Sequence, residues 1–137
     1  EWLEFIKRYT FDTDSVLVGH SLGTVLIFRF LELRSRPVGH VYLAAPLDED
    51  LGIAELRQSE FFAAPFDWEK IKHSAKSFSL FYSDDDPYIG VPMFERVAVH
   101  LGARQYFLPG RGHFNSQAWP ELFEAIIAQR NNEAKKQ

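Results

Sequence analysis

The sequence of 137 residues contains no cysteine, and it lacks several other features that mark particular classes of protein. Without cysteine, the chain can form no disulfide, no thiolate metal site and no cysteine nucleophile. The net charge is only −4, and the charged residues are scattered instead of forming the basic stripe of a nucleic-acid-binding protein. No apolar run reaches the roughly 18 residues that cross a bilayer. We therefore expect neither nucleic acid nor a membrane as a partner.

Apolar residues, by contrast, are abundant. They make up 46% of the chain and include 13 phenylalanines. This content rules out a disordered chain, and a chain of this length can bury a sizeable core. We expect one domain over residues 1–130, followed by a polar tail over residues 131–137, in a cytoplasmic protein.

Short apolar segments with the character of buried strands alternate with segments of helical periodicity. The alternation predicts βαβ units and hence an α/β fold, a three-layer α/β/α sandwich with a mostly parallel sheet. In such sheets the chemistry lies beyond the carboxyl ends of the strands. The first predicted strand is apolar on both faces, which is typical of a strand covered on both sides. The predicted strands cover residues 15–19, 40–46, 77–83 and 103–110, and the predicted helices cover residues 1–9, 21–34, 53–60, 67–75, 91–101 and 117–130.

Ser21 lies where the first predicted strand turns into a helix, in the sequence Gly19-His20-Ser21-Leu22-Gly23, which matches G-x-S-x-G. In this context the motif predicts a tight, strained turn that exposes a nucleophilic serine beyond the end of the sheet. Gly19 and Gly23 are expected because a Cβ atom at either position would collide with the neighbouring strand and helix. The amide of Leu22, at the start of the helix, is then placed to stabilise an oxyanion. The alternative is that Ser21 only caps the helix.

A nucleophilic serine needs a base, and the base needs an acid that orients it. In this kind of fold the order along the chain is serine, acid, histidine. Only His113 lies in a glycine-flanked loop beyond a predicted strand, which favours it as the base over a histidine that merely caps the last helix. The other histidines lie beside the serine (His20), at the start of a strand (His40) or in predicted helices (His73 and His100).

Three consecutive aspartates follow the third predicted strand, at the point where the acid is expected. Asp86 precedes Pro87, which biases the backbone of Asp86 toward an extended conformation. We therefore favour Asp86 as the acid and keep Asp84 and Asp85 as alternatives. Two other interpretations are a solvated turn and a site for a hard cation, although no further spaced oxygen ligands support the latter.

The segments GHSLGT at 19–24, SDDDPYI at 83–89 and GRGHFN at 110–115 resemble those of α/β-hydrolases. More narrowly, they resemble the small serine hydrolases of the retinoblastoma-binding protein 9/YdeN family. The resemblance covers nearly the whole chain, with the segments in the right order. It implies a catalytic triad carried by Ser21, Asp86 and His113 that hydrolyses small esters or amides without a metal or an organic cofactor.

One part of this fold is not apparent in the sequence. The resemblance implies a strand, a loop rich in His or Gly, a helix and another strand ahead of the segment that starts here, and that loop normally supplies the second oxyanion amide. We expect roughly 40–60 N-terminal residues, about two βα units of typical length, to be missing from this sequence or supplied by another chain. Without them, the free edge of the strand at 15–19 would be exposed.

The leading hypothesis is a serine hydrolase that acts on a small-molecule ester or amide through an acyl-enzyme. The alternative is a non-catalytic, protein-binding scaffold on the same fold, so a protein partner is left open. A docking motif of the Leu-x-Cys-x-Glu type is excluded because the chain has no cysteine. His20, Tyr88 and Phe114 flank the triad residues and are the predicted walls of the substrate site. The segment 47–76 is too short for a large lid, which predicts an open, shallow site.

Four aromatic residues in that segment admit two interpretations. They could line an acyl pocket, but aromatic residues at this spacing more often form core beneath a loop, and we favour the core. They are Phe61, Phe62, Phe66 and Trp68.

Overall fold

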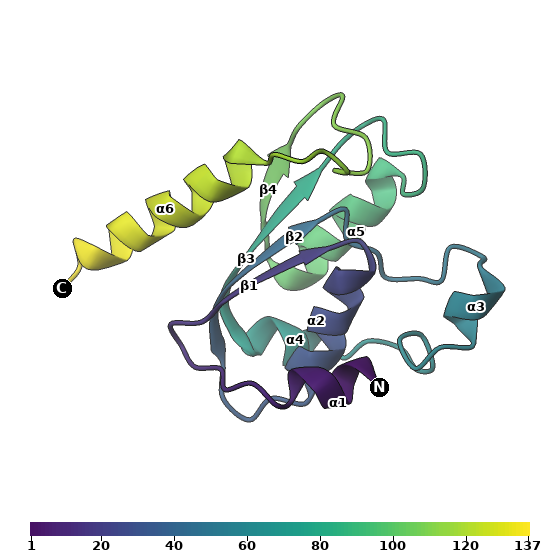
Figure 1. Cartoon of the computed structure of the whole chain (residues 1–137), viewed down its shortest axis with the longest axis horizontal. Helices are drawn as coiled ribbons and strands as arrows, with labels where there is room; N and C mark the ends of the chain where they lie inside the picture. Colours follow the sequence, from purple (N-terminus) through teal and green to yellow (C-terminus); the bar gives the residue numbers. More distant parts are fainter.

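The computed structural model describes residues 1–137 and contains a single sheet of four parallel strands (Figure 1). The strands lie in the order β1-β2-β3-β4, and each neighbouring pair is parallel. The α/β fold and the parallel sheet expected from the alternating pattern are therefore confirmed. The strands are β1 (Val16–His20), β2 (Val38–Ala44), β3 (Ala75–Tyr82) and β4 (Arg104–Phe107).

Six helices accompany the sheet. Because strand order follows chain order and crossovers between parallel strands are right-handed, the helices that connect the strands fall on one face of the sheet. The last helix lies on the other face and projects beyond the sheet, as the yellow helix in Figure 1 shows. The helices are α1 (Trp2–Ile6), α2 (Leu22–Glu32), α3 (Ala54–Arg57), α4 (Trp68–His73), α5 (Val91–Leu101) and α6 (Pro120–Ala134).

Most predicted elements are found within a few residues of their expected bounds, and two differ in an informative way. Helix α1 ends at Ile6, three residues before the expected end at residue 9. Helix α6 continues to Ala134, so it includes four residues of the segment expected to be a polar tail. The helix nevertheless buries no residue, because its sequence carries no wide apolar face.

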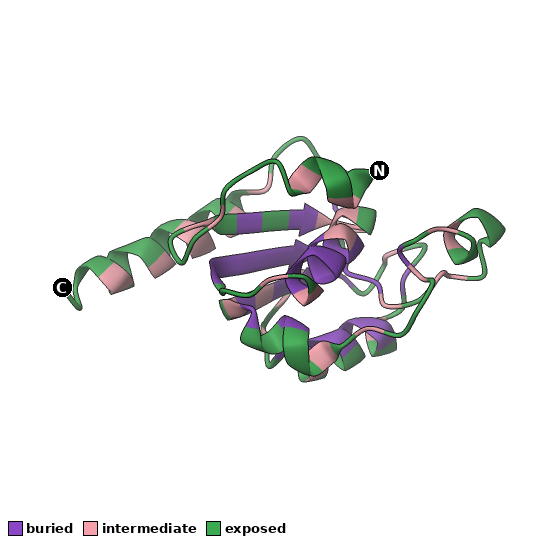
Figure 2. Ribbon diagram, turned by 90° about the horizontal axis from the view of Figure 1, so that it is seen from below, coloured by how far each residue is buried: buried purple, intermediate pink, exposed green.

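The hydrophobic core lies between the sheet and the helices α2, α4 and α5. All seven residues of β2 are buried, because this strand lies inside the sheet and has helices on both faces (Figure 2). The largest fully buried side chains include those of Phe28 in α2, Phe81 in β3 and Phe94 in α5. The rings of Phe28 and Phe94 lie in this layer, whereas the Phe81 ring lies on the other face of the sheet, stacked on Tyr106 and edge-on to Trp119.

Strand β1 is an edge strand, and the prediction that both of its faces are covered is wrong. Leu17 and Gly19 face α2 and are buried, whereas Val16 and Val18 point to the opposite face and are 37% and 49% exposed. Alternation of side chains along a strand places these two sets on different faces. The apolar character of β1 on both faces therefore did not reveal that only one face is covered in this chain.

The aromatic residues between β2 and β3 belong to the core, which was the favoured interpretation. Phe61 is buried, and the rings of Phe66 and Trp68 both contact Phe28 edge-on, with ring centroids 5.7 and 5.2 Å apart. The guanidinium group of Arg29 lies 4.0 Å from the centre of the Phe66 ring and donates hydrogen bonds to the carbonyl groups of this segment.

None of the helices in the structure is both long enough and apolar enough to cross a membrane.

Candidate active site

Ser21 occupies the turn between β1 and α2 in a backbone conformation that side chains rarely adopt. Its φ and ψ angles are 52° and −124°, as the elbow motif predicts. Such conformations cost of order 1–3 kcal/mol and persist only where the surroundings hold them. Here the Ser21 amide donates to the carbonyl group of Ala44 at 3.0 Å, and the Thr24 amide and hydroxyl both donate to the Ser21 carbonyl oxygen. The turn is thus fastened to β2 on one side and to α2 on the other.

The two glycines of the motif have different roles. A Cβ atom at Gly19 would lie 2.7 Å from Cδ1 of Ile27 and 3.1 Å from the backbone of Gly23, so the predicted collision is confirmed there. A Cβ atom at Gly23 would have no neighbour within 4 Å, so the same prediction is wrong for this residue. The physical reason is that the backbone of Gly23 faces β1, whereas the direction of its missing side chain points into open space.

The structure brings Ser21, His113 and Asp86 together although they are far apart in the chain. Nε2 of His113 lies 2.9 Å from the Ser21 hydroxyl oxygen, and Nδ1 lies 2.8 Å from Oδ2 of Asp86. An ionised carboxylate only accepts hydrogen bonds, so Nδ1–H donates to Asp86. In the neutral imidazole, Nε2 is then free to accept the proton of the Ser21 hydroxyl group. The ring therefore has the tautomer that a general base beside a serine requires.

The carboxylate of Asp86 is buried and fully partnered. Its side chain is 0% exposed, and that of His113 is 11% exposed. While Oδ2 faces His113, Oδ1 accepts the amides of Tyr88 and Ile89 at 2.8 and 3.0 Å. These three donors compensate the loss of hydration that burial of a charge entails. The bonds to the two amides also fix the direction in which the second oxygen points.

The other two aspartates contact the histidine loop through its backbone instead of its ring. Oδ1 of Asp84 accepts the amide of Gly110, and Oδ1 of Asp85 accepts the amide of Gly112. Of the three adjacent candidates, only Asp86 therefore reaches the imidazole of His113. The hydrogen bond from the Ser83 hydroxyl group and, to a smaller extent, that from the Gly112 amide lower the pKa of Asp85 below its ordinary value.

The residues expected to form the walls of the site lie in different environments. Tyr88 is 65% exposed, and its ring stands edge-on to that of His113, with ring centroids 5.0 Å apart. Phe114 is only 8% exposed and packs against Trp119, so its side chain belongs to the core and not to the surface of the site. The imidazole of His20 lies against that of His113 at a centroid distance of 5.0 Å, and its Nε2 donates to the His113 carbonyl oxygen at 2.6 Å.

The backbone around Leu22 has the arrangement expected of an oxyanion donor. Leu22 is the first residue of α2, and the amides in the first turn of a helix have no acceptor within the helix. Aligned peptide dipoles add partial positive charge at this end. The Leu22 amide follows directly after Ser21, so it is the free donor nearest to the nucleophile along the chain.

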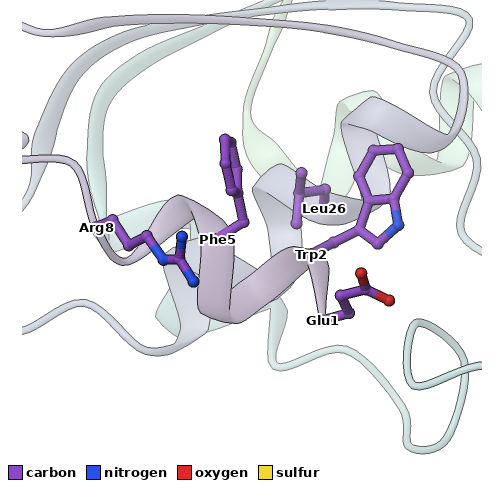
Figure 3. A pocket seen from close by; sticks show the side chains of 5 residues that line it. All are labelled: Glu1, Trp2, Phe5, Arg8 and Leu26. Carbon is purple, nitrogen blue, oxygen red and sulfur yellow. The ribbon is translucent and has the colours of Figure 1, made fainter.

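The pockets of the structure lie away from these residues. A pocket of about 540 Å³ lies between α1 and α2, where the rings of Trp2 and Phe5 stand on either side of Leu26 (Figure 3). Three other pockets are likewise lined by neither Ser21 nor His113. The nucleophile is therefore not enclosed in a cavity of this chain. No three His, Asp or Glu side chains gather in a group that could hold a metal ion.

Sequence reasoning missed a second group of polar side chains around His40. This histidine is 7% exposed and lies inside β2 instead of at the start of a strand. Its Nδ1 lies 2.6 Å from the hydroxyl group of Ser77 in β3, and its Nε2 lies 2.7 Å from Oε1 of Glu133 in α6. Only the apolar neighbours of His40 in the sequence indicated that it would be buried.

Comparison with known proteins assigns the chain to a family. A sequence model described as serine hydrolase matches residues 1–129. The chain belongs to the serine hydrolase family. This serine hydrolase is 32% identical over 126 residues to the serine hydrolase RBBP9 of Rattus norvegicus, covering 91% of the chain and 67% of that relative. It is also 32% identical over 119 residues to the putative hydrolase YdeN of Bacillus subtilis, covering 83% of the chain and 62% of that relative.

Solved structures agree with this assignment. The crystal structure of the ydeN gene product from B. subtilis superposes on this serine hydrolase with a TM-score of 0.84 and 28% identity, over 93% of this chain and 72% of that one. The crystal structure of esterase PE8 shares the fold with a TM-score of 0.59 and 20% identity, over 87% of this chain and 50% of that one. The α/β-hydrolase fold and the family expected from the three sequence segments are confirmed. The chain thus spans about two thirds of the length of RBBP9 and of YdeN.

Proposed function

We propose that this serine hydrolase cleaves small carboxylic esters or amides, with Ser21 as the nucleophile, His113 as the general base and acid, and Asp86 as the group that orients the imidazole. One observation carries the proposal. The hydroxyl oxygen of Ser21, the ring of His113 and the carboxylate of Asp86 are joined by consecutive contacts of 2.9 and 2.8 Å. Each group thus stands within hydrogen-bond distance of the group that activates or orients it.

In the acylation step, the Ser21 oxygen attacks the acyl carbonyl carbon while its proton passes to Nε2 of His113. The new C–O bond forms as the carbonyl π electrons move onto oxygen, which becomes an oxyanion. When this intermediate collapses, the bond to the alcohol or amine breaks, and the leaving group takes the proton from Nε2. The acyl group remains on Ser21 as an ester.

In the deacylation step, water replaces the leaving group. Nε2 of His113 takes a proton from the water as its oxygen attacks the acyl carbon, and the second intermediate breaks the bond to Ser21. The proton on Nε2 then returns to the Ser21 oxygen, and a carboxylic acid is released. Throughout both steps Asp86 stays ionised, and its charge stabilises the imidazolium ion that forms transiently on His113.

The amide of Leu22 is the proposed donor to the oxyanion in both steps. Its place at the first position of α2 directs a free N–H group and the positive end of the helix dipole toward the same point. One such donor typically contributes about 10²–10³ in rate.

Reaction with a fluorophosphonate probe tests the proposal. The probe forms a covalent bond only with an activated serine, so the full chain should be labelled and the Ser21→Ala variant should not. Mass spectrometry of the labelled peptide identifies the modified residue. A folded chain that is never labelled would instead favour the protein-binding scaffold.

The size of the acyl group is tested with nitrophenyl esters of increasing chain length. Because Ser21 and His113 line none of the four pockets, we expect acetate and butyrate esters to be preferred over long-chain esters. The ratio of kcat/KM between butyrate and dodecanoate esters measures this preference. A preference for the longer chain would contradict the proposed class of small substrates.

A further inference from the structure

Four consecutive residues around the proposed base are each held by a side chain from another segment. We call residues 110–113 the base loop and residues 83–89 the acid loop. The amides of Gly110, Arg111 and Gly112 donate to side chains at three consecutive positions of the acid loop, and the carbonyl oxygen of His113 accepts from His20. The four contacts are Gly110 to Asp84 Oδ1 at 3.0 Å, Arg111 to Ser83 Oγ at 3.0 Å, Gly112 to Asp85 Oδ1 at 2.8 Å, and His20 Nε2 to His113 O at 2.6 Å.

Two of the acid-loop side chains also bind each other. The Ser83 hydroxyl group donates to Oδ1 of Asp85 at 2.6 Å, so this single oxygen accepts both the serine and the Gly112 amide. Ser83 is 1% exposed, and its oxygen has no other partner than Asp85 and the Arg111 amide. The side chains of Ser83 and Asp85 therefore form one hydrogen-bonded unit. This unit accepts the amides of Arg111 and Gly112, the two residues directly before His113.

This unit and the triad share the same short segments of chain. Asp86 follows Asp85 directly, and His113 follows Gly112 directly. A shift of the base loop relative to the acid loop would therefore change the distance between Asp86 and Nδ1 of His113, which is 2.8 Å. Gly112 has a φ angle of 54°, a conformation in which a side chain would be strained. Apart from the hydrogen bond that the Arg111 carbonyl oxygen accepts from the Phe114 amide at 3.1 Å, the backbone of the base loop is held by the contacts to the acid loop and to His20.

We infer that Ser83 and Asp85 are positioning residues, which hold the backbone of the base loop so that the His113 ring meets both Asp86 and Ser21. This inference rests on the proposed function, because it assigns His113 the part of the base. Neither residue touches the reacting atoms. Their effect acts through the placement of His113, and misplacement of a reacting group by about 1 Å can lower a rate by about 10²-fold.

The geometry also indicates that Asp85 acts through the acceptor oxygen Oδ1 and not through its charge. Both of its contacts are accepted by Oδ1, and the amide oxygen of asparagine can accept the same two hydrogen bonds. Asp85→Asn should therefore preserve the unit, whereas Asp85→Ala should destroy it. If the negative charge of Asp85 were important instead, the two variants would be equally impaired.

The chain offers a closely matched control at Asp12. Oδ1 of Asp12 accepts one backbone amide, that of Asp14, and one serine hydroxyl group, that of Ser15, both at 3.0 Å. This is the same set of partners that Oδ1 of Asp85 has, but it lies in the loop that precedes β1, at the opposite end of the strand from Ser21. Asp12→Ala removes equivalent hydrogen bonds without touching either loop of the site.

The experiment measures kcat and KM for nitrophenyl acetate in the full chain and in the variants Asp85→Ala, Asp85→Asn and Asp12→Ala. We expect Asp85→Ala to lower kcat by about 10- to 100-fold with KM changed less than about twofold, because a misplaced base slows the chemical step more than binding. Asp85→Asn and Asp12→Ala should retain kcat within about threefold of the unaltered chain. Should Asp85→Ala fail to fold, Ser83→Ala takes its place in the series, because this variant removes the buried Ser83 oxygen from the same unit.

A second measurement does not depend on activity. The proton on Nδ1 of His113 that is shared with Asp86 should give a low-field proton NMR signal, which should persist in Asp85→Asn and Asp12→Ala and be lost or displaced in Asp85→Ala. An unchanged signal and an unchanged kcat in Asp85→Ala would overturn the inference, as would equal loss in Asp85→Asn. If the unaltered chain neither hydrolyses esters nor reacts with a fluorophosphonate, the proposed function fails, and the NMR signal alone decides whether Asp85 positions His113.

Discussion

Two groups in this protein have the same three components, a serine, a histidine and a carboxylate, and only one of them has the surroundings of a catalytic site. In the first, His113 stands between Ser21 and Asp86, with contacts of 2.9 and 2.8 Å. In the second, His40 stands between Ser77 and Glu133, with contacts of 2.6 and 2.7 Å. Distances between side chains do not distinguish the two groups.

The backbone around the serine distinguishes them. Ser21 lies on a strained turn with a φ angle of 52°, and the free amides of α2 begin directly after it. Ser77 lies inside β3 in register with His40, and the strand continues beyond it to Tyr82. No helix N-terminus follows Ser77 to stabilise an oxyanion. A hydrogen-bonded trio therefore becomes a candidate catalytic site only when its serine lies on such a turn with free donors beside it.

The carboxylates differ as well. The Asp86 side chain is 0% exposed and accepts two backbone amides besides the histidine, whereas the Glu133 side chain is 40% exposed. The first carboxylate is held by its own loop, and the second reaches His40 from the end of α6. We interpret the His40 group as a contact that fastens α6 to the sheet.

Replacing the two serines gives the largest expected difference between the groups. Ser21→Ala should lower ester hydrolysis by about 10⁴–10⁶-fold, because the nucleophile is lost. Ser77→Ala should leave kcat/KM within about twofold of the unaltered chain, because the Ser77 hydroxyl group contacts His40 and none of the three proposed triad residues. Hydrolysis of nitrophenyl acetate, with fluorophosphonate labelling as a second readout, measures both. Equal loss of ester hydrolysis in Ser21→Ala and Ser77→Ala would contradict the distinction between the two groups.

Replacing the two carboxylates with amides should give a smaller but still large difference. Asp86→Asn presents an N–H group to Nδ1 and favours the wrong tautomer of His113, which lowers kcat by about 10⁴-fold in sites of this kind. Glu133→Gln keeps an acceptor oxygen for His40 and should leave kcat unchanged. Steady-state kinetics of both variants test the assignment. Full activity of Asp86→Asn would show that His113 is oriented by another group.

The turn at Ser21 has no counterpart at Ser77, and replacing its two glycines tests how it is held. Gly19→Ala inserts a methyl group 2.7 Å from Ile27 and should destabilise the fold by about 1–3 kcal/mol. Gly23→Ala meets open space and replaces a helical glycine, so it should be neutral or stabilise by up to about 1 kcal/mol. Denaturant unfolding of both variants measures the free energies. A greater loss in Gly23→Ala than in Gly19→Ala would contradict the roles assigned to them.

The smallest expected effect is a dependence of stability on pH at the second group. The hydrogen bond from His40 lowers the pKa of Glu133 below its ordinary value of 4.5. A carboxyl group whose pKa is lower in the folded state stabilises that state above its ordinary pKa, and the contribution disappears as the pH falls through the folded value. The stability difference between the unaltered chain and Glu133→Gln should therefore shrink below about pH 4.5. Thermal unfolding between pH 3 and pH 7 measures it, and a difference that grows toward low pH would exclude the interpretation.

Features that are set by residues close together in the sequence could be predicted from the sequence. The bounds of α5 at Val91 and Leu101 agree with the prediction, because apolar periodicity and the residues that begin and end a helix are local signals. The strained turn at Ser21 was predicted for the same reason, since a glycine-flanked serine between a strand and a helix permits few backbone paths. The order of serine, aspartate and histidine along the chain also indicated which strand ends would meet.

The choice among three adjacent aspartates could not be made with the same certainty from the sequence. Asp84, Asp85 and Asp86 have the same side chain and nearly the same neighbours, and they differ only in the direction that the folded loop gives each of them. That direction is set by amides of the base loop and by those of Tyr88 and Ile89. Local residues thus indicated the chemistry that we propose for Ser21 and His113. Which carboxylate joins them, and which serine–histidine pair has free donors beside it, depends on contacts between segments that meet only when the sheet has formed.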